Sequence, residues 1–206
     1  TRVSERVYLF GGHAFWDRND VWYFEIGNLG WNEIRLGRGQ LKPPVRTEHS
    51  MVEMQGSLIV FGGRQGLSCL NDVWEFKTEL DLWEQHAANG NTDGPLARYA
   101  HSAVSIAGEM FVFGGQDANE QKRNDLWKWD FSGWSELSLS SRPSPRAGHR
   151  VARIGFSMFL FGGRDSSDSL LNDLWEYSTF DVRWMRKEPA TLPPPRYRHV
   201  MLGLGP

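Results

Sequence analysis

The sequence predicts an all-β protein in which small four-stranded sheets are repeated along the chain. Glycine pairs recur at steps of 51, 52 and 48 residues, at Gly11-Gly12, Gly62-Gly63, Gly114-Gly115 and Gly162-Gly163. A short apolar run precedes each pair: VYLF, LIVF, MFVF or MFLF. Runs of this length and composition are typical of buried strands, and no window shows the apolar spacing of a helix. Helix is therefore expected to be nearly absent.

Each repeat is expected to contain the same elements in the same order. It begins with Arg-x-x-His, which occurs at Arg46/His49, Arg98/His101, Arg146/His149 and Arg196/His199. A strand, a turn such as Gln55-Gly56-Ser57 and the apolar run follow. The glycine pair suits a chain that turns through positive φ or admits another backbone at close range.

The second half of each repeat is marked by tryptophan. Asn-Asp-(Val/Leu)-Trp opens a third strand at Asn19, Asn71, Asn124 and Asn172, and a second Trp marks a fourth strand at Trp31, Trp83, Trp134 and Trp184. The Asn-Asp pair is expected to cap its own backbone in a turn. The first tryptophans are expected to be equivalent and largely buried, at Trp22, Trp74, Trp127 and Trp175.

A four-stranded sheet of this size cannot bury both faces alone, and radial stacking of the copies into a β-propeller solves this. A period of about 50 residues is that of kelch blades. The apolar run with its glycine pair and the two spaced aromatics, each present four times, resemble the kelch family over almost the whole chain. The chain departs from the commonest kelch pattern by carrying Asn-Asp-x-Trp where many members have a Tyr.

The repeats predict a single domain over residues 1–206. Its repeats are approximately 1–45, 46–97, 98–145 and 146–195, with residues 196–206 as one further first strand. Two arrangements remain open. In a closed four-bladed ring, Arg196 to Gly205 would pair with Arg6 to Phe10; alternatively, the chain is part of a larger propeller, since kelch rings more often have more blades. Thr1 to Val3 match only the tail of a first strand.

Composition argues against several partners. The net charge is −2 and no basic run exceeds two residues, which disfavours nucleic acid. No run of 18 apolar residues occurs, so no membrane insertion is expected. The single Cys69 excludes a disulfide framework, and no Asn-x-Ser/Thr sequon occurs. An intracellular location is the expectation.

The repeated histidines, His49, His101, His149 and His199, are expected to be structural rather than metal ligands. A residue required once per blade is better explained by contacts between blades. The repeated arginines need partners if they are buried. The candidates are Asp20, Asp72, Asp125 and Asp173.

The family resemblance also raises an enzymatic alternative. Kelch relatives include galactose oxidase, with a copper site of Tyr, Cys and His, and plant specifier proteins that use iron. Neither constellation can be assembled here, because Cys69 lies on a variable loop and the two non-repeated histidines, His13 and His86, are not expected to converge. No phosphate-binding glycine motif or nucleophile elbow occurs. No catalytic residue, metal or cofactor is expected.

Binding is the favoured function: a protein-interaction scaffold or a subunit of a larger assembly. The loops after the glycine pairs and the linkers at 35–45, 86–97, 137–145 and 186–195 vary, and the resemblance places both sets around the channel mouth. Arg outnumbers Lys 18 to 5, and Arg matches carboxylates well. The candidate partner-binding residues are His13, Phe15, Trp16, Arg18, Arg64, Gln116 and Arg164, with Tyr99, Tyr197 and Arg198 from inside the motifs.

Overall fold

The computed structural model describes residues 2–3 and 6–203, and in this part the chain is all-β without any helix. The predicted fold class is therefore confirmed. A helix able to span a membrane is likewise absent from the described residues. The strands pair antiparallel into four main sheets, which we call blades 1 to 4.

The blades follow the repeats of the sequence. Blade 1 contains β1 (Arg2–Val3), β2 (Arg6–His13), β3 (Asp17–Glu25) and β4 (Gly30–Ile34). Blade 2 contains β5 (Ser50–Met54), β6 (Ser57–Gln65), β7 (Ser68–Lys77) and β8 (Leu82–Ala87). Blade 3 contains β10 (Ser102–Ile106), β11 (Glu109–Asp117), β12 (Lys122–Asp130) and β13 (Gly133–Glu136). Blade 4 contains β15 (Arg150–Ile154), β16 (Ser157–Phe161), β18 (Leu174–Ser178) and β19 (Arg183–Lys187).

Three two-residue strands lie between the blades. β9 (Arg98–Tyr99) pairs with β11, and β14 (Arg146–Ala147) pairs with β17 (Arg164–Asp165). These pairings join an Arg-x-x-His motif to the strand end that follows the glycine pair of the same repeat.

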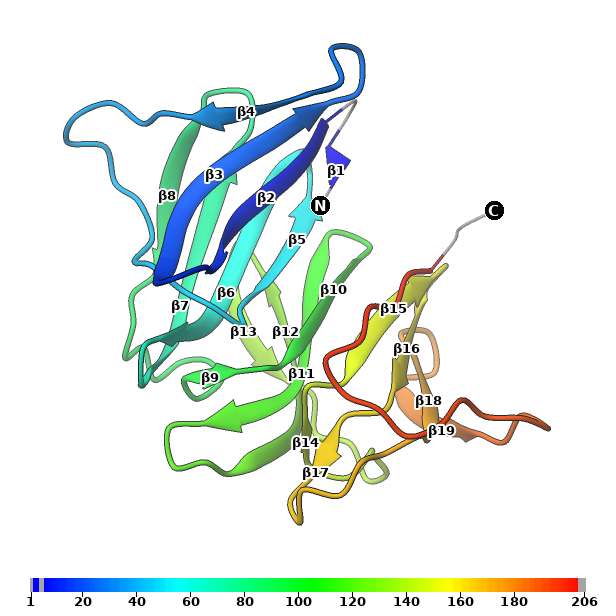
Figure 1. Cartoon of the computed structure of the whole chain (residues 1–206). Coiled ribbons are helices and arrows are strands. Elements are labelled where there is room, and N and C mark those ends of the chain that lie inside the picture. The colour runs from blue at the N-terminus through cyan, green and yellow to red at the C-terminus, as the bar shows by residue number, and fades with distance from the viewer. Residues whose placement is uncertain (1, 4–5, 204–206) are drawn as a thin grey trace.

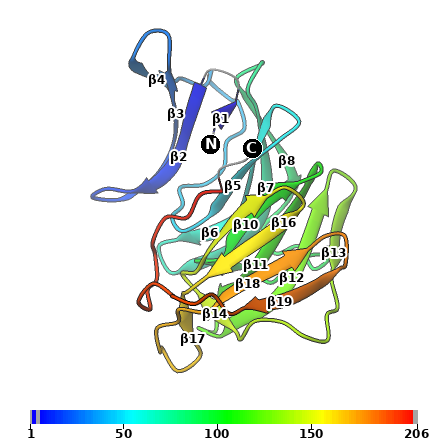
Figure 2. The same ribbon diagram turned by 90° about the vertical axis from the view of Figure 1, so that its right-hand side faces the viewer.

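The blades are arranged in an arc whose two ends, blades 1 and 4, lie apart (Figures 1 and 2). Strand β10 contacts both β5 and β15, so these first strands line the inside of the arc. Of the two arrangements that the sequence left open, the described residues do not form the closed four-bladed ring. The described part of the C-terminal segment, residues 196–203, forms no strand, and β2 pairs with β1 and β3 instead.

The C-terminal segment stays with blade 4 because its backbone is bonded there. The amide of Gly163 donates to the carbonyl of Arg196 at 2.8 Å, and the amide of Arg198 donates to the carbonyl of Gly148 at 2.7 Å. Residues 204–206, part of the strand expected to close the ring, lie outside the described residues.

The core lies between blades rather than inside any one of them. One buried cluster joins blades 1 and 2, a second joins blades 2 and 3, and a third joins blades 3 and 4. In the first cluster, the ring of Phe10 lies 4.8 Å from that of Trp83. Each blade is therefore stabilised by packing against its neighbours, which bury the apolar side chains on its faces.

The first tryptophans of the four blades are not equally buried. Trp74 is 5% exposed, whereas Trp22, Trp127 and Trp175 are only half-buried. Each indole N–H donates to the Asp two residues earlier, for example from Trp74 to Asp72 at 2.7 Å. That carboxylate is buried in blade 2 but partly exposed in blades 3 and 4, which keeps their indoles near solvent.

Both predicted uses of the glycine pair occur in blade 2. Gly62 and Gly63 have φ of 60° and 92°, and a β-bulge interrupts the ladder between Phe61 and Gly63. A Cβ on Gly63 would lie 2.6 Å from the carbonyl oxygen of Thr47 and 2.8 Å from the Cβ of His49. The second glycine therefore makes room for the Arg-x-x-His motif.

The expectation that Asn-Asp caps its own turn is wrong. The pair lies inside β3, β7 and β12, where an extended backbone points the Asn side chain away from its own amides. Asn71 donates instead to the carbonyls of Asn91 at 2.8 Å and Pro95 at 3.2 Å. Asn19 does the same to Pro43 at 2.8 Å, so this side chain ties the following linker to its sheet.

Candidate functional site

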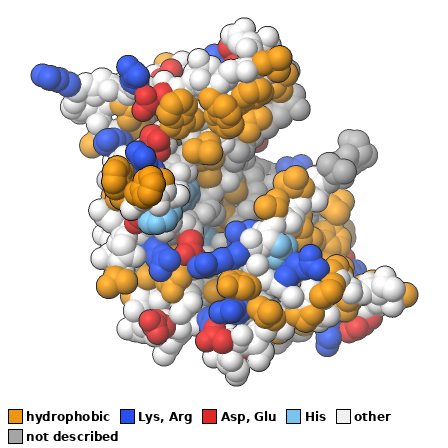
Figure 3. Space-filling model, in the orientation of Figure 1, with side chains coloured by type: hydrophobic (Ala, Val, Ile, Leu, Met, Phe, Trp, Pro, Cys, Tyr) orange, Lys and Arg blue, Asp and Glu red, His pale blue; other side chains and the backbone are white. Residues whose placement is uncertain are grey.

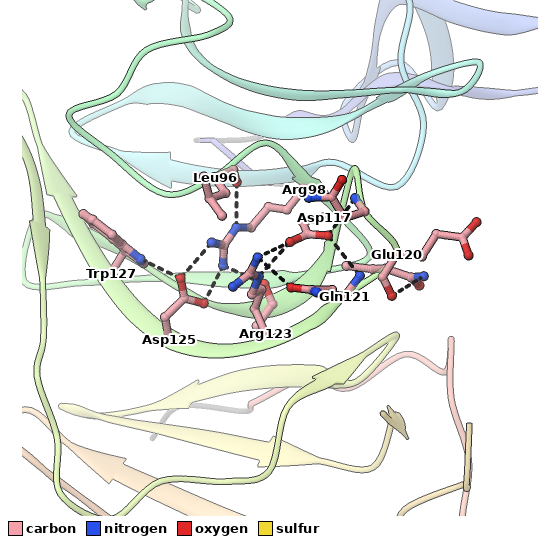
Figure 4. A network of polar contacts seen from close by, with 11 residues as sticks. Leu96, Arg98, Asp117, Glu120, Gln121, Arg123, Asp125 and Trp127 are labelled. Atoms are coloured by element: carbon pink, nitrogen blue, oxygen red, sulfur yellow. Dashed lines mark hydrogen bonds and ion pairs between the residues drawn. The ribbon is translucent and has the colours of Figure 1, made fainter. Parts of the chain in front are cut away.

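A buried Arg–Asp pair anchors each of the first three Arg-x-x-His motifs, with the aspartates that the sequence offered as candidate partners. Arg46 donates from Nη1 and Nη2 to the two oxygens of Asp72 at 2.8 and 2.7 Å, and from Nη1 to the Gly62 carbonyl at 2.9 Å. Arg98 pairs in the same way with Asp125 (Figure 4), and Arg146 with Asp173. Bidentate pairing with a shared carbonyl satisfies a buried guanidinium.

The third residue of each motif forms a backbone arc across the blades. These residues have left-handed φ of 53–67°: Glu48, Ala100, Gly148 and Arg198. The amide of Ala100 donates to the Glu48 carbonyl at 3.0 Å, Gly148 to Ala100 at 2.8 Å, and Arg198 to Gly148 at 2.7 Å. This continuous chain of hydrogen bonds holds the four motifs around one opening.

We call this opening the mouth groove. It consists of a cavity of about 140 Å³ and an adjoining cavity of about 670 Å³, which share Glu48, Arg64 and Arg198. Lysine and arginine side chains gather across the middle of this face (Figure 3). Seven of the ten candidate residues line the two cavities: His13, Arg64, Tyr99, Gln116, Arg164, Tyr197 and Arg198.

Two arginine–tyrosine stacks form the walls of the mouth groove. The Cζ of Arg64 lies 4.9 Å from the ring centroid of Tyr99, and the Cζ of Arg164 lies 4.1 Å from that of Tyr197. Burial raises the pKa of Tyr99. Stacking holds a guanidinium on a flat surface while leaving its N–H groups available at the ring edge.

Glu48 is the acidic residue at the centre of the groove, and the sequence reasoning missed it. Its Oε1 accepts from Arg64 at 2.8 Å and from Arg198 at 3.1 Å. The sequence contained a signal for this residue, because Glu48 occupies the same position in its Arg-x-x-His motif as the candidate Arg198 does. Its other oxygen, Oε2, is buried without a hydrogen-bond partner among the described residues.

Positive charge exceeds negative charge in the smaller cavity. Lys122 and Asp168 pair with each other at 2.7 Å, which leaves three arginines and Glu48. The Nε of Arg164 is buried and has no hydrogen-bond partner in the described structure. Beside them, burial lowers the pKa of Arg150, although the nearby Glu48 acts in the opposite direction. The groove can therefore accept an additional anionic group.

The remaining candidates, Phe15, Trp16 and Arg18, do not line the cavities. Phe15 is 92% exposed and Trp16 is 64% exposed, and Arg18, which lies in β3, stacks on Trp16 at 5.5 Å. Their hairpin is held beside the groove, because the carboxylate of Asp17 accepts from the Gly66 amide at 2.9 Å. These residues form an exposed aromatic border.

Loop 116–123 of blade 3 is ordered by one carboxylate (Figure 4). Asp117 accepts from the amides of Asn119 and Gln121, each at 2.9 Å, and from Arg123 Nε at 2.8 Å. Burial acts to raise the pKa of Asp117, but these donors lower it overall. Gln116, in β11, directly precedes this hydrogen-bonded turn.

The repeated histidines lie in the blade junctions rather than in the groove. His49, which is half-buried, and His101, which is buried, pack edge-on against Phe10 and Phe61 at 5.3 and 5.1 Å. Burial lowers the pKa of each of these two histidines to about 3, so both are neutral. His101 Nε2 lies 2.9 Å from the hydroxyl of Ser50 in the preceding blade.

Two polar features lie elsewhere. Glu75, Glu84 and His86 have potential metal-ligating atoms within 4.8 Å of one another. However, His86 Nε2 is 2.8 Å from Glu75, and Glu84 is paired with Lys77, so these atoms already have partners. Cys69, expected on a loop tip, lies in β7 opposite Arg64.

Comparison with known proteins agrees with this architecture. A family model described as the KLHDC2/KLHL20/DRC7 Kelch-repeats domain matches residues 1–94 and 88–205. The chain belongs to the kelch-repeat family.

Several curated relatives share part of this kelch fold. The leucine-zipper-like transcriptional regulator 1 homolog of Drosophila melanogaster is 36% identical over 110 residues, covering 49% of this chain and 11% of the relative. Leucine-zipper-like transcriptional regulator 1 of Mus musculus is 32% identical over 151 residues, covering 68% and 18%. Host cell factor 1 of Rattus norvegicus is 32% identical over 133 residues, covering 55% and 6%. The chain thus spans less than a fifth of each of these relatives.

Proposed function

We propose that this kelch chain is a non-enzymatic scaffold that binds an acidic segment of a partner protein in the mouth groove. The excess of arginine over carboxylate in the smaller cavity carries the proposal. Arg64 and Arg164 hold matching places two blades apart, and each is oriented by a tyrosine. Preorganised guanidinium groups bind carboxylates with little loss of side-chain entropy.

The groove is asymmetric, which supports one orientation of a bound segment. His13 and Gln116 hold the places in blades 1 and 3 that Arg64 and Arg164 hold in blades 2 and 4. The aromatic border of Phe15 and Trp16 lies on the blade 1 side only. An acidic group at the arginines and an apolar side chain at the border would together define a direction.

The probe is an array of twelve-residue peptides in which acidic members have matched amide versions, with Asp and Glu replaced by Asn and Gln. We expect binding of acidic members only. For the tightest peptide, Arg64→Ala plus Arg164→Ala should weaken binding at least about tenfold, since each lost charge-assisted hydrogen bond is worth about 1.5–3 kcal/mol.

Arg35→Ala is the matched control, because Arg35 is exposed and, among the described residues, pairs only with Glu33, which lies outside the groove. Glu48→Gln should tighten binding, because it removes the competing carboxylate. Equal binding of acidic and amide peptides would contradict the proposal. A stoichiometric transition metal in the purified protein would contradict its non-enzymatic part.

A further inference from the structure

The smaller cavity of the mouth groove carries an excess of two positive charges. Its lining contains two carboxylates, Glu48 and Asp168, and four basic side chains, Arg64, Lys122, Arg164 and Arg198. Lys122 and Asp168 neutralise each other at 2.7 Å, and Glu48 neutralises one of the three arginines. A single carboxylate from a ligand would neutralise half of the remaining excess, whereas a dianionic group would neutralise all of it.

Two of the three arginines already converge on one oxygen atom. Arg64 Nη2 and Arg198 Nη2 both donate to Oε1 of Glu48, at 2.8 and 3.1 Å. Arg64 is in β6 of blade 2, and Arg198 is in the segment that follows blade 4. Glu48 therefore acts as an internal anion that keeps two guanidinium groups within reach of one shared acceptor.

Tyr197 brings the third arginine to the other two. The Cζ of Arg164 and the Cζ of Arg198 lie 4.1 and 5.7 Å from the centroid of this one ring. A Cβ on Gly148 would lie 3.3 Å from Cδ2 of Tyr197, so this glycine lets the ring lie close to the backbone. The Nε of Arg164 is buried and finds no acceptor among the described residues. The three guanidinium groups thus surround one site, and one of their donors is unused.

A fourth arginine lies beside this site. Arg150 donates from Nη1 to the carbonyl of His149 at 3.0 Å. Burial lowers the pKa of Arg150 and the like charge of Arg198 lowers it further, although Glu48 acts in the opposite direction. An anion held between the arginines would relieve this repulsion between like charges.

A phosphate monoester matches these features better than a carboxylate does. It carries a charge of about −1.5 to −2 near pH 7 and offers three strong acceptor oxygens. A carboxylate carries one charge on two oxygens. Arginine binds phosphate oxygens through paired N–H groups, and clusters of arginines are a recurring means of recognising phosphorylated segments. The phosphodiesters of nucleic acid carry one charge each, which leaves the same excess as a carboxylate.

We propose that the smaller cavity of the mouth groove binds a phosphate group on a serine or threonine of the partner segment. This inference rests on the proposed function, because the phosphorylated residue belongs to the acidic segment that the groove binds. Arg64, Arg164 and Arg198 hold the phosphate, and Glu48 keeps two of these guanidinium groups in place when the cavity is empty. Phosphorylation of the partner then raises its affinity for this chain.

The test uses fluorescence polarisation with the same array of peptides. Every acidic member is synthesised again with phosphoserine at each acidic position in turn, and with serine as the uncharged version. We expect at least one phosphoserine version to bind about tenfold or more tighter than its carboxylate parent, since one further charge-assisted hydrogen bond changes affinity by about that factor or more. The serine version should bind more weakly than the parent.

The ratio of the affinities for the phosphoserine and carboxylate versions separates recognition from damage to the fold. Arg164→Gln and Arg198→Gln should each reduce this ratio to about one, whereas a damaged fold would weaken both versions equally. Arg35→Gln is the control and should leave the ratio unchanged, because Arg35 pairs with Glu33 outside the groove. An unchanged ratio in both groove variants overturns the assignment to this cavity.

The remaining outcomes distinguish this inference from the proposed function. Carboxylate peptides that bind as tightly as all their phosphoserine versions overturn the phosphate site but leave the proposed function standing. Tight binding of phosphoserine versions alone supports the phosphate site and removes carboxylate recognition. A version with two adjacent glutamates that binds as tightly overturns the need for one dianionic group. Inorganic phosphate that competes at the same concentration as the peptide overturns the assignment to a protein segment.

Discussion

Arg46 and Asp72 form a fully buried, bidentate ion pair, with side chains 0% and 2% exposed. The pair joins the segment that enters blade 2 to the third strand of that blade. Its geometry recurs in blades 3 and 4, whereas Arg196 and Asp20 each remain without such a partner among the described residues.

Arg46→Ala should lower the free energy of unfolding by about 3–5 kcal/mol, because it leaves the carboxylate of Asp72 buried and unpaired. Arg196→Ala is the control within the same repeat motif and should cost less than about 1 kcal/mol. Urea denaturation measures both. Equal losses would show that the buried pair does not explain the requirement for arginine.

Trp83→Ala should cost about 3–5 kcal/mol, because its ring is buried against Phe10 and Phe76. Trp31→Ala, at the equivalent but half-exposed position, should cost less than about 1 kcal/mol. Thermal or urea unfolding compares the two. A loss of stability from Trp31→Ala as large as that from Trp83→Ala would contradict the exposure of Trp31 on blade 1.

Stability should fall as the pH decreases from about 6.5 toward 3, because His49 and His101 stay neutral when folded. Burial lowers the pKa of both to about 3, so only the unfolded chain takes up protons in this window. Each contributes a slope of about 1.4 kcal/mol per pH unit. His101→Asn should reduce the slope by that amount. Unfolding midpoints across this range provide the measurement.

Gly63→Ala should destabilise the fold by about 1–3 kcal/mol more than Gly12→Ala. Both glycines have positive φ, 92° and 101°, so both changes strain the backbone. Only Gly63 has the Thr47 carbonyl oxygen 2.6 Å from the position of the added Cβ, and nothing lies within 4 Å at Gly12. Similar losses of stability at both sites would show that glycine is required for its positive φ alone, and not for the close approach of the Thr47 carbonyl.

The sequence by itself determined the elements that depend on local pattern. Apolar runs, glycine pairs and regular spacing specify strands and turns within a repeat. The recurrence of Arg46 and Asp72 in three complete copies was enough to predict their pairing. The Asn-Asp error arose because a local turn and a long-range bond from Asn71 to Pro95 use the same side-chain atoms.

Only the tertiary structure decided which residues meet across repeats. Trp31 and Trp83 have matching sequence positions, yet one is half-exposed and the other buried, because burial depends on whether a neighbouring blade covers the face. Glu48 and Arg198 are 150 residues apart and meet through the left-handed backbone arc, which no local pattern specifies. The open arc was likewise decided by backbone hydrogen bonds that hold the Arg196 segment on blade 4.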